Sequence, residues 1–109
     1  MIIHCGEITV GENIRIAETF MTRLVGLMGK KDLKEDEGLL LMRCAAIHCF
    51  FMKIPIDAVY LSKDMKVLGM ETLQPWSLGR HIKNTAHVLE LSAGSTAGKL
   101  KIGDQLVLS

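Results

Sequence analysis

The chain has 109 residues and a formal net charge of +1, with 49% hydrophobic and 23% charged residues. This length suits one domain, and the composition excludes the disordered and fibrous classes. The basic residues are scattered, so nucleic-acid binding is not indicated, and no apolar run reaches the roughly 18 residues that span a bilayer.

The first ten residues, MIIHCGEITV, lack the basic region and long apolar run of a signal peptide. We therefore expect a cytoplasmic protein without membrane insertion. The three cysteines are an odd number, and in the cytoplasm we expect them to be reduced.

Near the N-terminus, GEITV and ENIRIAE predict two short strands around Gly11. From Ala17 to Met28, apolar residues recur at intervals of three and four. This spacing predicts one amphipathic helix at about residues 19–29. Arg23 falls at the edge of its apolar stripe, where the aliphatic stem can lie on the core and the guanidinium at the rim.

After the helix, a charged loop leads into short apolar segments that are bounded by turn residues, which is typical of strands. Residues 56–62 and 66–73 flank a short polar turn and predict a hairpin. A short helix or turn is expected from Ser95 to Lys101. The other predicted strands are residues 39–42, 86–92 and 102–109.

These elements contain no strand, helix, strand alternation. They predict a single α+β domain over residues 1–109, with a compact, mostly antiparallel β-sheet or small barrel and one main helix. We find no internal repeat and no low-complexity segment.

Two carboxylates lie within apolar strands, Asp57 in IDAVYL and Glu90 in VLEL. A buried charge must be paired, or its pKa must shift. One interpretation is a structural ion pair between Arg23 and one of these carboxylates. The other is a polar cluster of Arg23, Asp57 and Glu90 that binds a ligand, and the sequence leaves both open.

The segment RCAAIHCFFMKIPID holds Cys44, His48 and Cys49. With Cys5 as a fourth ligand, these residues are weak candidates for a metal site, because the spacing is not a known zinc pattern. Cys44 and His48 would be neighbours on one helical turn, as a thiol nucleophile and its base require. Cysteine is more often a buried packing residue, which is the interpretation we favour.

The sequence has no phosphate-binding loop, no dinucleotide-binding fingerprint and no nucleophile elbow. No cofactor is therefore expected, and no catalytic signature supports an enzyme. The leading hypothesis is a non-catalytic module that binds a small ligand or a protein through Arg23, Asp57 and Glu90. The alternative is a thiol- or metal-dependent protein that uses Cys44 and His48.

Several blocks, AETFMTRLVGLMGKKDLKEDEGLLL, CAAIHCFFMKIPIDAVYL and VLELSAG, resemble the DUF192 (UPF0127) family in order and spacing. The chain is similar to a branch with Cys-x3-His-x-Phe-Phe-Met in place of the F-W-M-K-N block of many relatives. The resemblance implies a β-rich α+β domain and no particular activity. The matching positions are Thr19, Arg23, Gly26, Leu27, Met28, Gly38, Met52, Pro55, Asp57, Pro75, Leu89, Glu90, Gly94, Gly103 and Asp104.

Overall fold

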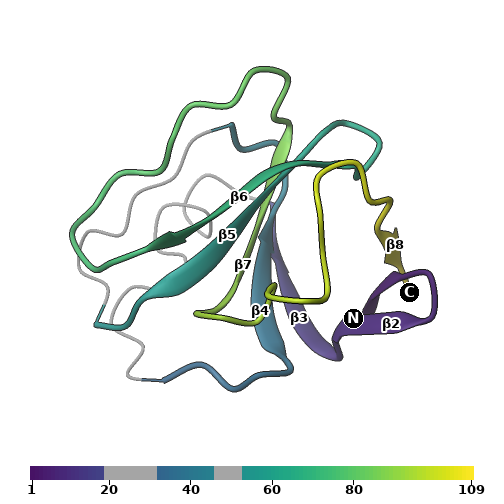
Figure 1. Ribbon diagram of the computed structural model, residues 1–109, viewed down its shortest axis with the longest axis horizontal. Helices are drawn as coiled ribbons and strands as arrows, with labels where there is room; N and C mark the ends of the chain where they lie inside the picture. Colours follow the sequence, from purple (N-terminus) through teal and green to yellow (C-terminus); the bar gives the residue numbers. More distant parts are fainter. Residues whose placement is uncertain (19–31, 46–52) are drawn as a thin grey trace.

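The structure is a computed structural model that describes residues 1–18, 32–45 and 53–109, and these residues form two β-sheets (Figure 1). The three-stranded sheet contains, in spatial order, β2 (Ile8–Gly11), β1 (Ile3–Cys5) and β8 (Val107–Leu108). The five-stranded sheet contains β3 (Asn13–Ala17), β4 (Glu37–Leu41), β7 (His87–Ser92), β5 (Ile56–Leu61) and β6 (Val67–Leu73).

Strand pairing in the five-stranded sheet is antiparallel except at one edge, where β3 runs parallel to β4. β5 and β6 form the predicted hairpin, which is confirmed. β7 inserts between β4 and β5, so the central strands are β4, β7 and β5. Every residue of β5 is buried, as expected for a strand covered on both faces.

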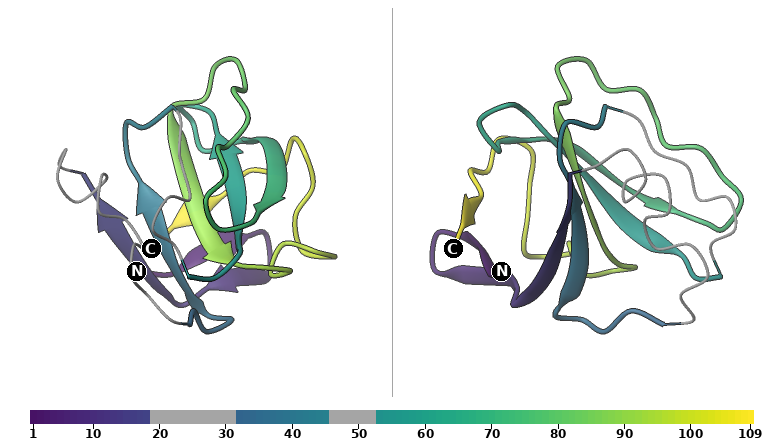
Figure 2. Two further views of the ribbon diagram at one scale, coloured as in Figure 1. Left: turned by 90° about the vertical axis from the view of Figure 1, so that its left-hand side faces the viewer. Right: turned by 180° about the vertical axis from the view of Figure 1, so that it is seen from behind.

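The five-stranded sheet has two faces, which we name after residues of β5. The Val59 face carries an apolar cluster that includes residues of the three-stranded sheet, such as Ile3 and Val10. The three-stranded sheet therefore packs beside this face, as the two views in Figure 2 show. The Tyr60 face carries a second apolar cluster, in which Tyr60 lies with Leu39 and Val88.

The predicted α+β class is wrong for the described part of the chain, which is all-β. The predicted helix at residues 19–29 falls on residues outside those that the structure describes. The small barrel is also wrong, because the strand order of the larger sheet ends at β3 on one side and β6 on the other. Within the described residues, no helix is long and apolar enough to cross a membrane.

The segment from Ser95 to Lys101, predicted as a short helix or turn, forms turns over residues 95–99. Gly94 and Gly98 have positive φ angles of 87° and 74°, which interrupt a right-handed helix. β1 was not predicted, because three residues next to the chain end carry too little periodicity. Its pairing partner β8 is shorter than the expected strand at residues 102–109.

Gly38, on β4, is closely surrounded by residues of the two neighbouring strands β3 and β7. A Cβ at this position would be 2.8 Å from the Glu90 carbonyl oxygen and 2.7 Å from a methyl group of Leu91. It would also be 2.8 Å from a methyl group of Ile14. Glycine therefore permits the close packing of β3, β4 and β7 on the Val59 face.

We expect Gly38→Ala to lower the free energy of unfolding by about 1–3 kcal/mol, because the backbone oxygen of Glu90 cannot move away cheaply. Urea denaturation followed by circular dichroism measures the change. Thr9→Ala, at an exposed position of β2, is the control and should change stability by less than about 0.5 kcal/mol. A Gly38→Ala protein as stable as the wild type would contradict this account of the packing.

Candidate functional site

The two carboxylates predicted to form one cluster lie on opposite faces of the five-stranded sheet. Glu90 pairs with Ala58, whereas Asp57 pairs with Leu91. Paired residues of neighbouring strands share a face, and successive residues alternate between faces. The structure therefore does not bring Asp57 and Glu90 together, and Arg23 lies outside the described residues.

Asp57 is a buried carboxylate whose oxygens are held by hydrogen bonds. Thr72 Oγ1 donates to Oδ1 at 2.7 Å, and Thr96 donates to Oδ2 through its backbone N–H at 3.1 Å and its hydroxyl at 2.9 Å. Burial alone would raise the pKa of Asp57, but these bonds and one from the Gly94 backbone outweigh it, so the pKa lies below its ordinary value. Asp57 thus fixes the turn after β7 to the sheet, which is a structural role.

Glu90 is a buried carboxyl group of a different kind, because no hydrogen bond or ion pair joins its side chain to the described residues. Its exposed fraction is 4%. Leu39 and Ala58 flank it on the neighbouring strands of the Tyr60 face. Burial raises the pKa of Glu90 from 4.5 to about 7. Near neutral pH the group can therefore donate a proton to a hydrogen bond or accept one.

Glu71 lies across Ala58 from Glu90, and its carboxylate, unlike that of Glu90, has hydrogen-bond partners among the described residues. It accepts hydrogen bonds from the Tyr60 hydroxyl and, at 2.7 Å, from the Arg80 backbone N–H. Arg80 Nε also lies 3.5 Å from Glu71 Oε1. Burial, together with the Glu71 bond, raises the pKa of Tyr60. Glu71 was not predicted as part of a polar group, although it has the same position in the alternation as the buried Gly69 and Leu73.

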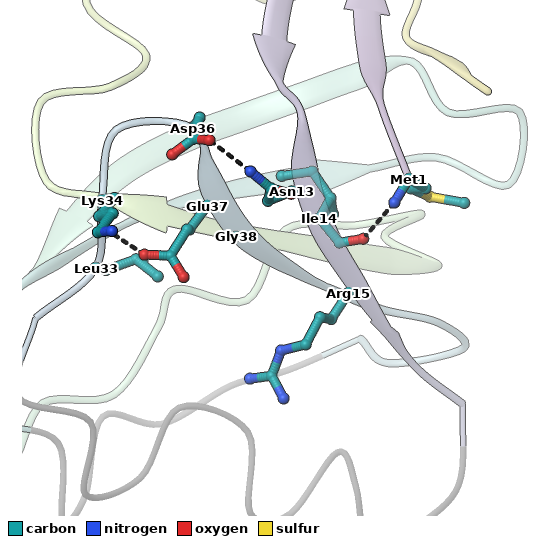
Figure 3. Close-up of a pocket in the computed structure, with 9 residues that line it drawn as sticks. All are labelled: Met1, Asn13, Ile14, Arg15, Leu33, Lys34, Asp36, Glu37 and Gly38. Atoms are coloured by element: carbon teal, nitrogen blue, oxygen red, sulfur yellow. Dashed lines mark hydrogen bonds between the residues drawn. The ribbon is translucent and has the colours of Figure 1, made fainter.

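A pocket of about 420 Å³ opens at the edge of the sheet beside β3 and β4 (Figure 3). Within it, Asn13 donates to the Asp36 carboxylate, and the Lys34 backbone N–H donates to Glu37 Oε1 at 2.9 Å. The guanidinium of Arg15 has no hydrogen bond to the other residues drawn in Figure 3. The pocket is lined by Met1, Asn13, Ile14, Arg15, Leu33, Lys34, Asp36, Glu37 and Gly38.

The predicted thiol and imidazole candidates are only partly described. Cys44 is half-buried and packs against the apolar cluster of the Tyr60 face. His48 and Cys49 lie outside the described residues. Cys5 packs against the apolar cluster of the Val59 face, on the opposite face of the sheet from the cluster that Cys44 contacts. In the described part of the chain, no group of three or more His, Cys, Asp or Glu side chains could hold a metal ion.

Together, the described residues define a small two-sheet β structure with two buried carboxyl groups, of which Asp57 is hydrogen-bonded and Glu90 has no partner among these residues. Residues 4–108 match the DUF192 family, which is described as uncharacterized. A UPF0127 protein of Pyrococcus horikoshii is 31% identical over 97 residues, covering 85% of this chain and 84% of the relative. Another from Pyrococcus furiosus is 28% identical over 108 residues, covering 92% and 93%. The chain belongs to the DUF192, or UPF0127, family.

Two crystal structures have the same fold. A protein of unknown function from Novosphingobium aromaticivorans has a TM-score of 0.81 and 24% identity, covering 87% of this chain and 74% of that one. A protein from Sinorhizobium meliloti, described as a candidate transcription regulator, has a TM-score of 0.80 and 24% identity, covering 97% and 88%. These matches show the family and the fold. They do not show the Cys-x3-His-x-Phe-Phe-Met branch.

We expect Asp57→Asn to lower the free energy of unfolding by about 2–3 kcal/mol at pH 7, because an amide nitrogen would face hydrogen-bond donors. The Asp57 pKa is lower in the folded state, so its stabilising effect is present above its unfolded pKa and is lost as pH falls through the folded pKa. The deficit of the variant should therefore shrink in acid. Denaturation at several pH values measures it, with Asp64→Asn in an exposed turn as the control. An equal deficit at all pH values would contradict the assignment.

Glu90→Gln should make the protein more stable at pH 8. The Glu90 pKa is raised on folding, so below about pH 4.5 the group is protonated in both states and does not lower the free energy of unfolding. As pH rises above 4.5, ionisation of Glu90 in the unfolded state lowers the free energy of unfolding, until pH exceeds the folded pKa of about 7. One pKa unit corresponds to about 1.4 kcal/mol, so the gain at pH 8 is at most about 3 kcal/mol. Denaturation at pH 5 and pH 8 measures the difference, with the exposed Glu7→Gln as the control. A less stable Glu90→Gln protein at pH 8 would indicate the structural ion pair instead.

Proposed function

We propose that this protein is a non-catalytic binding module for a small ligand that presents a hydrogen-bond donor or a positive charge to Glu90. The observation that carries the proposal is the burial of this carboxyl group without a partner among the described residues. Buried polar groups in folded proteins are normally hydrogen-bonded, and exceptions call for an explanation. A ligand that donates to Glu90 would recover the free energy that its burial costs.

The surroundings of Glu90 support a ligand with an apolar part. Leu39, Ala58 and Val88 are buried around it on the Tyr60 face. An apolar wall with one oriented polar group is the usual design of a small-molecule site, because the wall provides affinity and the polar group fixes orientation. Asp57 takes no part in the proposed site, since its oxygens are used by Thr72 and Thr96 on the opposite face.

Other functions have less support. Cys44 packs against the apolar cluster, and no group of three or more His, Cys, Asp or Glu side chains among the described residues could hold a metal ion, so a thiol or metal function has less support than the Glu90 site. The regulator of Sinorhizobium meliloti shares the fold, but a net charge of +1 and scattered basic residues give no electrostatic surface for DNA.

A thermal-shift screen tests the proposal, using small cations, neutral hydrogen-bond donors and anions as separate groups. We expect compounds from the first two groups to stabilise the wild type, by about 2.7 kcal/mol at a hundred times their Kd. The same compounds should have little effect on Glu90→Gln and their full effect on Glu7→Gln. The absence of any shift, or equal shifts in the wild type and Glu90→Gln, would refute the proposed site.

A further inference from the structure

Five residues form one row across the Tyr60 face, because their strands pair in register. Arg15 pairs with Leu39, Leu39 with Glu90, Glu90 with Ala58, and Ala58 with Glu71. Glu71 is engaged by Tyr60 and Arg80. Within the described residues, this leaves Arg15 and Glu90 as the two charged groups of the row without an ion pair. They are two strand spacings apart, or about 10 Å between their backbones.

The pocket lies at the Arg15 end of this row. Leu33 lines the pocket and also packs against the apolar cluster that contains Leu39. Its side chain is only half-buried, whereas Leu39 is 4% exposed. A molecule in the pocket would contact Arg15, and Leu33 lies between the pocket and the apolar cluster that contains Leu39.

From this arrangement we infer that the ligand is a zwitterion, with an ammonium group for Glu90 and a carboxylate for Arg15 at the two ends of an aliphatic chain. The aliphatic chain of the ligand lies over Leu39. This inference rests on the proposed function and adds the chemical class of the ligand. Arginine binds a carboxylate through two parallel N–H groups, and a buried carboxylate binds an ammonium group, so each end of the ligand has a matched partner.

Charged and titratable groups around Glu90 set the pH dependence of binding. In the described part of the chain, Arg15 and Glu71 share its row, and Glu37, Tyr60 and Cys44 lie in or against the same face. Glu71 and Tyr60 bind each other. Glu90 is partly protonated near pH 7 and must ionise to bind an ammonium group. Binding at pH 6 should therefore release a proton, and the affinity should rise with pH up to about 7.

Isothermal titration calorimetry with four six-carbon probes tests the inference: 6-aminohexanoate, hexylamine, hexanoate and 1,6-diaminohexane. We expect 6-aminohexanoate to bind the wild type most tightly. Arg15→Gln should weaken it about tenfold without affecting hexylamine, and Glu90→Gln should weaken both about tenfold. Titration at pH 6 in two buffers of different ionisation enthalpy should detect the released proton. Lys63→Gln and Glu7→Gln, which remove exposed charges elsewhere, are the controls.

Tighter binding of the diamine than of the zwitterion would overturn the role of Arg15, and equal binding of hexanoate would overturn the role of Glu90. If hexylamine binds through Glu90 and the carboxylate adds nothing, the zwitterion is refuted and the proposed function stands. The zwitterion is also refuted, and the proposed function stands, if none of the four probes binds but the thermal-shift screen finds a ligand that requires Glu90. The zwitterion and the proposed function are both refuted if no compound in the thermal-shift screen depends on Glu90.

Discussion

The register between β5 and its two neighbours is the constraint on which the rest of the structure depends. Because Ala58 pairs with both Glu90 and Glu71, these carboxyl groups share the Tyr60 face. Asp57, the residue before Ala58, pairs with Thr72 and Leu91 and therefore points to the Val59 face. A slip of β5 by one residue would turn Asp57 to the Tyr60 face, away from its hydrogen-bond partners Thr72 and Thr96. The burial of every residue of β5 makes such a slip costly.

Because of this register, the buried carboxyl groups on the two faces of the five-stranded sheet have different surroundings. On the Val59 face, Asp57 joins the turn around Thr96 to the sheet, and the three-stranded sheet contributes residues such as Ile3 and Val10 to the apolar cluster. The buried carboxylate of this face, Asp57, has hydrogen-bond partners within the protein. On the Tyr60 face, Glu71 is satisfied in the same way, but Glu90 is not satisfied within the described residues. The proposed function follows from this difference between neighbouring carboxyl groups.

Much of the β structure could be predicted from the sequence, because alternating apolar residues and turn signals mark β5, β6 and β7 clearly. The predicted α+β class depended on the periodic signal at residues 17–28, of which residues 19–28 are not described, and the described residues are all-β. Alternation also places Glu90 with Val88 and Asp57 with Val59, but only the pairing between strands shows that these faces are opposite. The Arg15 row could not be predicted, since it depends on the parallel pairing of β3 with β4. The predicted cluster with Arg23 lies partly outside the described residues.

The central claim is that Glu90 is a buried carboxyl group whose partner is a ligand. The most direct measurement is a titration of the Glu90 side-chain carboxyl carbon by nuclear magnetic resonance, with the protein free of ligand. Glu90→Gln identifies the resonance, and Glu7 provides an exposed carboxyl group for comparison. We predict a pKa of about 7 for Glu90. A pKa at or below the ordinary value of 4.5 would contradict the account, because it would mean that a group of the protein itself stabilises the ionised form.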